Sequence, residues 1–269
     1  MEWFEALILG IVQGLTEYLP VSSSGHLELG KILLGINPSE TNESFGTTFN
    51  VVLHLATVFS TWVILRKEIA EILKGLFQFK INEEFWFAAK IVVSMIPAAI
   101  VGLLYEDQID AAFSGSALLV GLMLFLTGAL LFLADKATQT DGKVGFKEAI
   151  LVGVAQAIAL APGISRSGAT ISTCVLLKID KERAARFSFL MVMPLIIAKV
   201  AKDLLGGEFA LGTDTLLPMG VGFLGAFFVG LLACQWMINL VKNGKLVYFS
   251  IYCFIIGTVA VGYSVLYNV

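Results

Sequence analysis

The segment from Pro162 to Thr170 combines residue types that bind phosphate groups. It reads Pro-Gly-Ile-Ser-Arg-Ser-Gly-Ala-Thr and runs directly into an apolar stretch of helical length. Glycine lets the backbone approach a ligand, and the free N–H groups and positive dipole end at the start of a helix attract anions. Arg166 adds a planar fork of donors that suits phosphate oxygens. We therefore predict an anion-binding loop whose members are Gly163, Ser165, Arg166, Ser167, Gly168 and Thr170.

A second set of polar residues lies near the start of the chain. Gln13 and Glu17 are spaced i to i+4 and share one face of a helix. Glu17 is a candidate ligand for a divalent cation or a general base, and Gln13 offers a neutral oxygen. His26 is a candidate for proton transfer or for attack on phosphorus. The loop between them contributes Ser22, Ser23 and Ser24.

Three other features rank below these two sets. His54 lies one turn after Asn50 within an apolar stretch, and the favoured interpretation is a hydrogen bond to a neighbouring helix rather than a place in the site. Gln156 is expected to support the second loop without touching a substrate. The basic cluster at 181–186 is predicted to lie at the membrane surface.

The composition identifies a membrane protein. Of the 269 residues, 57% are hydrophobic and 14% are charged, and the mean hydropathy is +0.86. Soluble domains average roughly 25% charged residues, so a disordered chain, a secreted disulfide scaffold and a nucleic-acid-binding protein are poor fits. The net charge of −3 likewise predicts no nucleic-acid partner. The three cysteines lie in apolar stretches and are predicted to be packing residues.

The chain is predicted to cross the membrane six times. A bilayer core of about 30 Å needs roughly 20 apolar residues in a helix. Six stretches qualify, at 48–65, 87–105, 117–134, 186–203, 215–241 and 246–267. Two further apolar regions, 4–30 and 148–178, are broken by proline, glycine and serine. Each is predicted to be a re-entrant hairpin of two short helices, with eight full crossings as the alternative.

The basic residues predict the orientation. Most of them lie in four loops, at 66–90, 135–147, 178–186 and 242–245. Cytoplasmic loops carry the excess of Lys and Arg, so these four loops are predicted to face the cytoplasm. The first hairpin then enters the membrane from outside and the second from inside.

The two interrupted regions are related to each other. A shift of 143 positions pairs Gly10 with Gly153, Gln13 with Gln156, Ser22 with Ser165, Ser24 with Ser167 and Gly25 with Gly168. We predict a single, all-α, polytopic membrane domain of two repeats, 1–134 and 146–269, each a re-entrant hairpin followed by three transmembrane helices. Three crossings invert the second repeat, and matching broken segments in inverted halves indicate a binding site near the membrane midplane.

Both polar sets also have a purely structural interpretation. Serine and threonine commonly cap helices, and a buried Glu17 would pair with Arg166 to offset the cost of burial. We favour a functional site, because an arginine on a Gly/Ser loop inside a membrane is costly and usually functional.

The two sets together resemble a known family. Gln13-x-x-x-Glu17, followed by Pro20-Val-Ser-Ser-Ser-Gly-His26, and the loop Pro162-Gly-Ile-Ser-Arg-Ser-Gly-Ala-Thr170 are similar to the two signatures of the undecaprenyl-diphosphate phosphatases of the BacA type. The length and the hydrophobic layout agree with that family over nearly the whole chain. Gln13 is a mild departure that the family accepts, so a role at this position cannot require a second negative charge.

The resemblance implies hydrolysis of undecaprenyl diphosphate to undecaprenyl phosphate and inorganic phosphate. This reaction recycles the lipid carrier of cell-wall synthesis in the bacterial cytoplasmic (inner) membrane. The resemblance also implies a divalent cation, Mg²⁺ or Ca²⁺, which is expected at Glu17. The implied catalytic residues are Glu17, Ser23, His26 and Arg166. Substrate binding is assigned to Gln13, Ser22, Ser24, Gly163, Ser165, Ser167, Gly168 and Thr170.

The residues leave three questions open. The attacking group is Ser23, His26 or water, with the two side chains slightly favoured. An alternating-access transporter or flippase of a phosphorylated lipid or anion is the alternative function, since inverted repeats with broken helices are common in carriers. A homodimer is among the states that the sequence allows. Either function requires a site that opens sideways to membrane lipid, because an isoprenyl diphosphate joins a charged head to a long hydrocarbon tail.

Overall fold

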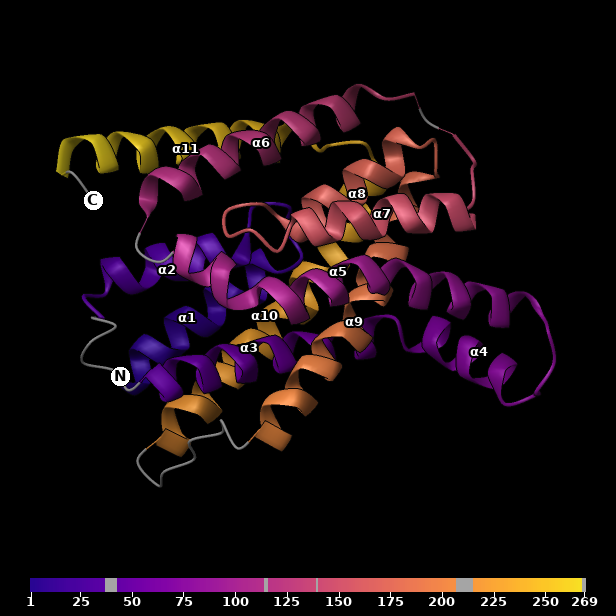
Figure 1. The fold of residues 1–269 in the computed structure, drawn as a ribbon, viewed down its shortest axis with the longest axis horizontal. Helices are drawn as coiled ribbons and strands as arrows, with labels where there is room; N and C mark the ends of the chain where they lie inside the picture. The colour runs from indigo at the N-terminus through magenta and orange to yellow at the C-terminus, as the bar shows by residue number, and fades with distance from the viewer. Residues whose placement is uncertain (37–42, 114–115, 139, 207–214, 268–269) are drawn as a thin grey trace.

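The computed structural model describes residues 1–36, 43–113, 116–138, 140–206 and 215–267 (Figure 1). Within these ranges the chain is helical, and no strand occurs beyond an isolated bridge between Gly142 and Ile179. The helices are α1 (Trp3–Thr16), α2 (Ser23–Leu33), α3 (Glu43–Ile64), α4 (Arg66–Leu76), α5 (Glu83–Phe113), α6 (Ala117–Lys136), α7 (Phe146–Ile158), α8 (Arg166–Leu176), α9 (Lys181–Gly206), α10 (Leu216–Lys242) and α11 (Val247–Tyr267). The predicted all-α class is confirmed.

Five of the described helices are long and apolar enough to cross a membrane. They are α5, α6, α9, α10 and α11, and they match five of the six predicted spans. The sixth prediction, at 48–65, corresponds to α3, whose segment Thr48–Ile64 passes as a candidate span only together with α4. These two helices meet at a bend of 81°. The described residues therefore contain five spans, or six when the bent pair counts as one.

The prediction of a loop at 66–90 is wrong. Residues Arg66–Leu76 form α4, and α5 already begins at Glu83. The sequence of α4 places apolar residues at helical spacing among charged ones, so Ile69 and Ile72 pack against the core while Lys67 stays exposed. A short amphipathic helix of this kind is suited to lie along the membrane surface.

Both interrupted regions fold into two short helices joined by a turn, as predicted. Helices α1 and α2 form the first hairpin and α7 and α8 the second, and the partners contact each other in both. The second helix of each hairpin begins with the same cap. Ser22 Oγ accepts the backbone N–H of Gly25 at 3.3 Å, and Ser165 Oγ accepts that of Gly168 at 3.0 Å.

Small residues let each hairpin pack closely on a long helix of the other half. Helix α1 packs on α10, where a Cβ added at Gly10 would meet the carbonyl oxygen of Gly222. Helix α7 packs on α5, where a Cβ added at Gly153 would meet the carbonyl oxygen of Ser94. The two hairpins are therefore held at fixed positions by backbone contact. The cysteines are buried free thiols, as predicted: Cys174, Cys234 and Cys253.

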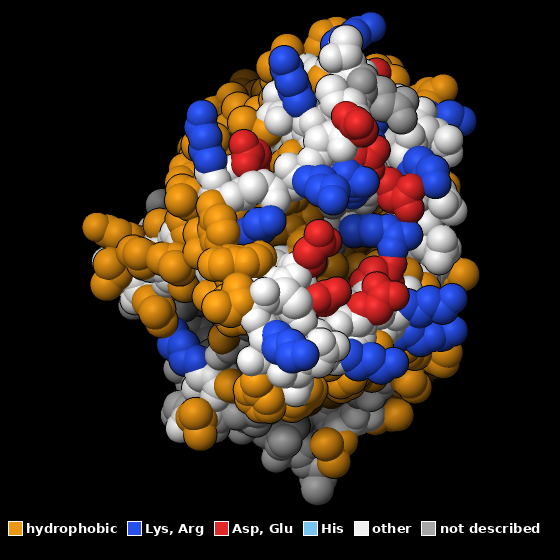
Figure 2. Space-filling view, turned by 90° about the vertical axis from the view of Figure 1, so that its right-hand side faces the viewer, with side chains coloured by type: hydrophobic (Ala, Val, Ile, Leu, Met, Phe, Trp, Pro, Cys, Tyr) orange, Lys and Arg blue, Asp and Glu red, His pale blue; other side chains and the backbone are white. Residues whose placement is uncertain are grey.

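The four segments predicted to be cytoplasmic meet at one end of the molecule. Arg186 at the start of α9 pairs with Glu68 of α4 and, at 2.9 Å, with Glu182. Lys242 at the end of α10 pairs with Glu182 at 2.8 Å, and Val247 donates its N–H to Asp135 at 3.1 Å. Figure 2 shows Lys, Arg, Asp and Glu side chains gathered on one face, with hydrophobic side chains around them. The basic loops thus share one end, as the predicted orientation requires.

Candidate active site

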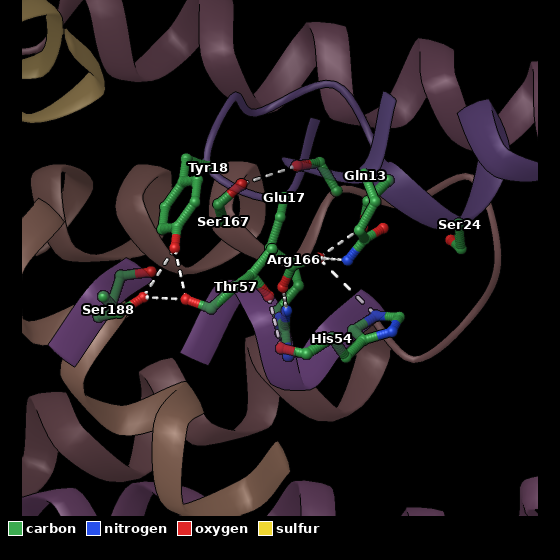
Figure 3. A network of polar contacts seen from close by, with 12 residues as sticks. Gln13, Glu17, Tyr18, Ser24, His54, Thr57, Arg166, Ser167 and Ser188 are labelled. Carbon is green, nitrogen blue, oxygen red and sulfur yellow. Dashed lines mark hydrogen bonds and ion pairs between the residues drawn. The ribbon is translucent and has the colours of Figure 1, made fainter. Parts of the chain in front are cut away.

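A buried carboxylate lies at the centre of the site. Glu17 follows α1 directly, and only 8% of its surface is exposed. Removing a carboxylate from water is costly unless donors compensate for the lost hydration. Four side chains lie against Glu17, and they come from both hairpins and from α3 (Figure 3).

The four contacts are divided between the two oxygens of Glu17. Arg166 forms an ion pair with Oε1. Oε2 accepts hydrogen bonds from Gln13 Nε2 at 3.0 Å and from Ser23 Oγ at 2.8 Å. His54 Nε2 lies 3.8 Å from the same oxygen. The two hairpins thus bring Glu17 and Arg166 face to face, as the sequence predicts.

Ser23 is positioned by an unusual backbone conformation. Ser22, which caps α2, has φ +71°, in the left-handed region that side chains other than glycine rarely adopt. Its neighbour Ser23 is therefore the first residue of α2, beside the free N–H groups of the first turn. Strained residues of this kind cluster at functional sites.

The loop before α8 is fixed by α6. Gly163 has φ +93°, and a Cβ there would lie 2.7 Å from the carbonyl oxygen of Val120, so this position requires glycine. Thr127 Oγ1 accepts the N–H of Ser165 at 3.0 Å and donates to the carbonyl of Gly163 at 3.5 Å. Arg166 is consequently held at the start of α8, where backbone N–H groups favour an anion.

Hydroxyl groups line a pocket beside the ion pair. Tyr18 donates to the carbonyl of Thr57 at 2.6 Å, and its oxygen lies 3.0 Å from Thr61 Oγ1. The hydroxyl oxygen of Ser188 on α9 lies 2.6 Å from the hydroxyl oxygen of Thr170. Tyr18, Thr57, Thr61 and Ser188 line the pocket together with Glu17 and Arg166. Apolar residues complete the wall: Val58, Phe189, Val192, Met193 and Ile196.

His26, which is predicted to be catalytic, makes its contacts away from Glu17. Its Nδ1 lies 2.8 Å from the carbonyl oxygen of Ser22, and its Nε2 lies 2.8 Å from the hydroxyl of Tyr252 on α11. The imidazole also stacks on the Tyr252 ring, with 5.6 Å between the centroids. Both ring nitrogens therefore have partners other than the carboxylate, and a catalytic role for His26 stays a prediction.

The remaining hydroxyls predicted to bind substrate are placed differently from one another. Ser24 is exposed, 3.4 Å from Ser22 Oγ, and lies apart from Glu17 in Figure 3. Ser167 is buried and donates to the carbonyl of Leu19 at 3.3 Å, which ties the two hairpins together. Thr170 donates to the carbonyl of Arg166 at 2.8 Å within α8. Ser167 lies against the pocket, whereas Ser24 does not line it.

The residues beside Glu17 fit a divalent cation that also binds the substrate. Among the residues that the structure describes, no three His, Cys, Asp or Glu side chains gather as a metal cage. Mg²⁺ is commonly bound by one or two carboxylates together with substrate phosphates. Glu17 supplies one carboxylate, and the neighbouring Gln13 Oε1 is buried without a hydrogen-bond partner. An oxygen of this kind is a suitable further ligand.

A comparison with known protein families identifies the family of this chain. The family model of the bacitracin resistance protein BacA matches residues 6–259. The chain belongs to the BacA family. The match includes both hairpins and extends into α11, so every residue in contact with Glu17 lies inside it.

Curated relatives of this BacA chain are named undecaprenyl-diphosphatase. The protein of Christiangramia forsetii is 57% identical over 261 residues, which cover 97% of this chain and 98% of the relative. The protein of Bacteroides fragilis is 50% identical over 265 residues, with coverage of 97% and 98%. The protein of Salinibacter ruber is 39% identical over 269 residues, with coverage of 96% and 97%. The family resemblance noted in the sequence is confirmed.

Sequence reasoning ranked some residues of this BacA site too low. His54 faces Glu17, although a contact with a neighbouring helix was the favoured interpretation. One signal was available, since His54 is one of only two histidines and lies at helical spacing from Asn50. Thr127 and Tyr252 had no such signal, because they reach the hairpins only through the packing of α6 and α11.

Proposed function

We infer that this BacA protein is an integral membrane phosphatase that hydrolyses undecaprenyl diphosphate to undecaprenyl phosphate and inorganic phosphate. It thereby recycles the lipid carrier for bacterial cell-wall synthesis. The observation that carries this conclusion is the meeting of Glu17, Ser23 and Arg166 in one buried site built from two hairpins. The shared name of relatives that match nearly the whole chain supports the same function.

Arg166 is the proposed anchor for the terminal phosphate. When the substrate binds, the guanidinium of Arg166 turns from Glu17 Oε1 to the phosphate oxygens. These oxygens also accept hydrogen bonds from the N–H groups in the first turn of α8. Phosphoryl transfer depends mainly on positioning and on donors that stabilise the developing charge. The guanidinium of Arg166 and the start of α8, which already lie together at the site before the substrate arrives, supply both.

Ser23 is the proposed nucleophile and Glu17 its general base. The hydrogen bond of 2.8 Å already directs the serine proton at the carboxylate. As Ser23 Oγ bonds to the terminal phosphorus, its proton passes to Glu17 and the bond from phosphorus to the bridging oxygen breaks. Undecaprenyl phosphate leaves with that oxygen and takes the proton from Glu17.

A water molecule completes the proposed reaction. Glu17 accepts a proton from the water, whose oxygen attacks the phosphoserine and releases inorganic phosphate. The proton on Glu17 then returns to Ser23 Oγ, so the enzyme regains its starting state. His26 is not favoured as the nucleophile, because both of its ring nitrogens contact Ser22 and Tyr252 instead.

A divalent cation, Mg²⁺ or Ca²⁺, is proposed to bind at Glu17 and Gln13 together with the substrate. The buried and unpaired Gln13 Oε1 supports this assignment. When bound there, the cation would neutralise part of the charge on the diphosphate. The residues of the two loops, rather than the cation, orient the reacting groups.

The other predicted site residues are proposed to shape the two phosphate-binding turns. Ser22 and Ser165 fix the starts of α2 and α8 as caps. The remaining members support the second turn or extend the contact with substrate: Ser24, His26, Gly163, Ser167, Gly168 and Thr170.

The two halves, 1–134 and 146–269, are proposed to be inverted repeats within the bacterial inner membrane. Equivalent caps at the starts of α1 and α7 support this, since Glu5 accepts the N–H of Glu2 at 2.6 Å and Glu148 accepts that of Gly145 at 3.0 Å. The packing of each hairpin on a helix of the other half, α1 on α10 and α7 on α5, supports it further. In this arrangement both hairpins are re-entrant, the four basic segments face the cytoplasm, and the site lies near the midplane and opens sideways to lipid.

The alternative of a transporter or flippase is not favoured. An anion carrier needs a binding group such as Arg166. Transport does not, however, require a serine hydroxyl that donates to a buried carboxylate, as Ser23 does to Glu17. A homodimer stays a prediction.

Phosphate release by the purified protein tests the proposed function. Isoprenyl diphosphates of several chain lengths are supplied with Mg²⁺, with Ca²⁺ and with chelator. We expect inorganic phosphate and isoprenyl monophosphate in equal amounts, and loss of activity with chelator. Movement of the lipid across a vesicle membrane without phosphate release would contradict the proposal.

A further inference from the structure

His54 approaches the site from α3, outside both hairpin motifs. Its Nε2 lies 3.8 Å from Glu17 Oε2, and Figure 3 shows the ring directed at the carboxylate. About a third of the side chain, 31%, is exposed, so an ion that enters the site can reach it. The contact is too long for a hydrogen bond.

The hydrogen bond on the other side of the ring fixes its tautomer. His54 Nδ1 lies 2.8 Å from the backbone carbonyl oxygen of Asn50. A carbonyl oxygen only accepts, so Nδ1 carries the hydrogen and the neutral ring presents a bare lone pair at Nε2. Metal-ligating histidines almost always donate their other N–H in this way, which fixes the ring and raises its basicity.

Two acceptors therefore face each other at Glu17. The Nε2 lone pair and the negative Oε2 repel unless a positive charge lies between them. Atoms that are bound to one ion at about 2.1 to 2.4 Å each lie roughly 3 to 4 Å apart. The distance of 3.8 Å is within that range.

Two amide oxygens on the helices that carry this pair lack hydrogen-bond partners. Gln13 Oε1 is buried and unpaired, and a half-turn of the amide would place it where Nε2 now lies, 3.0 Å from Glu17 Oε2. Asn50 Oδ1 is also buried and unpaired, on the same face of α3 as His54. Unpaired buried oxygens are costly unless a ligand satisfies them.

We propose that His54 Nε2 is a direct ligand of the divalent cation, next to Glu17 Oε2, with Gln13 Oε1 as a third ligand. The inference rests on the proposed function, because the cation is the one that its hydrolysis requires. Mn²⁺ shares the oxygen-ligand preference of Mg²⁺ and Ca²⁺, and it therefore serves as a paramagnetic probe of this site. The cation site then joins the first hairpin to α3.

Pulsed electron paramagnetic resonance of bound Mn²⁺ tests the proposal. The protein is purified through a tag without histidine and is loaded with Mn²⁺, alone and with a methylene-bridged isoprenyl diphosphonate that cannot be hydrolysed. The chain contains two histidines, so His26→Ala leaves His54 as the only imidazole. We expect the nitrogen coupling of a bound imidazole in the wild type and in His26→Ala.

Substitution of His54 provides the complementary measurement. We expect His54→Ala and His54→Gln to lose the nitrogen coupling, and His54→Ala to weaken Mn²⁺ binding about tenfold or more. Thermal unfolding shows whether each variant keeps its fold, and His54→Gln retains the bulk of the side chain. Bound Mn²⁺ without nitrogen coupling in His26→Ala, or no bound Mn²⁺ in either condition, overturns the assignment. Phosphate release would persist in that case, which separates this failure from failure of the proposed function.

Discussion

At the scale of single residues, the site is defined by the side chains that contact Glu17. Its carboxylate accepts from Ser23 and Gln13 and pairs with Arg166 in the same structure. A buried ion pair contributes little net stability, whereas removal of one partner leaves a charge without compensation. The pair is therefore better explained as a binding site prepared for a phosphate than as a structural contact.

Arg166→Ala should abolish most of the turnover. Loss of a guanidinium that stabilises the transferring phosphoryl group lowers kcat on the order of 10³-fold or more. Phosphate release by the purified variant measures this effect, and the matched control is Arg66→Ala at the exposed start of α4. If Arg166→Ala kept most of its activity, the assignment of the phosphate anchor would be wrong.

Ser23 should carry the phosphoryl group during turnover. Rapid acid quenching with substrate labelled at the terminal phosphate is expected to leave label on the wild-type protein and none on Ser23→Ala. Ser24→Ala is expected to retain the label, because Ser24 is exposed and lies apart from Glu17. Acid-stable label on Ser23→Ala would point to another serine or threonine as the nucleophile.

At the scale of elements, the two hairpins depend on close helix packing for their position. Helix α1 carries Gln13 and leads directly into Glu17, and it meets α10 backbone to backbone at Gly10 and Gly222. A shift of α1 would therefore move the carboxylate away from Arg166. Stability and activity are coupled at this contact.

Gly10→Ala should lower both thermal stability and activity. The added methyl group would press on the carbonyl of Gly222, and such overpacking costs about 1 to 3 kcal/mol. Thermal unfolding in detergent and phosphate release measure the two effects. The control is Gly220→Ala on α10, where no atom lies within 4 Å of the new Cβ. Equal midpoints for the two variants would show that the α1–α10 contact is not tight.

At the scale of the whole molecule, charge and packing define two different regions. Basic and acidic side chains of α4, α9 and α10 pair with each other at one end, and Figure 2 shows charged side chains of both signs gathered on one face. Large apolar side chains are exposed elsewhere, for example Leu103 and Leu232. A surface of this kind is stable only where lipid covers it.

The proposed orientation predicts opposite labelling of two introduced cysteines. Lys245→Cys, between α10 and α11, should react with a membrane-impermeant maleimide from the cytoplasmic side only. Lys31→Cys, near the end of α2, should react from the outside only. The native cysteines are buried, so they give little background. Reaction of both positions from the same side would mean an even number of crossings between them, and would rule out a re-entrant second hairpin.

The sequence alone determined the features that depend on local chemistry. Long apolar stretches require helices, glycine and proline interrupt them, and the serine caps start α2 and α8 at related positions. The motif around Arg166 and the pair Gln13 and Glu17 could be assigned for the same reason. Helix α4 was missed, because its charged residues outweighed the apolar face that becomes visible only at helical spacing.

Only the tertiary structure decided which residues meet at the carboxylate. His54 lies against Glu17 and His26 against Tyr252, although sequence proximity favoured His26 for the site. The difference arises because His26 lies on the side of α2 that meets Tyr252 of α11, whereas His54 lies on the side of α3 that meets Glu17. Contacts between residues distant in the chain depend on how the helices pack, so the motifs could bring Glu17 and Arg166 together but could not decide which histidine reaches the carboxylate.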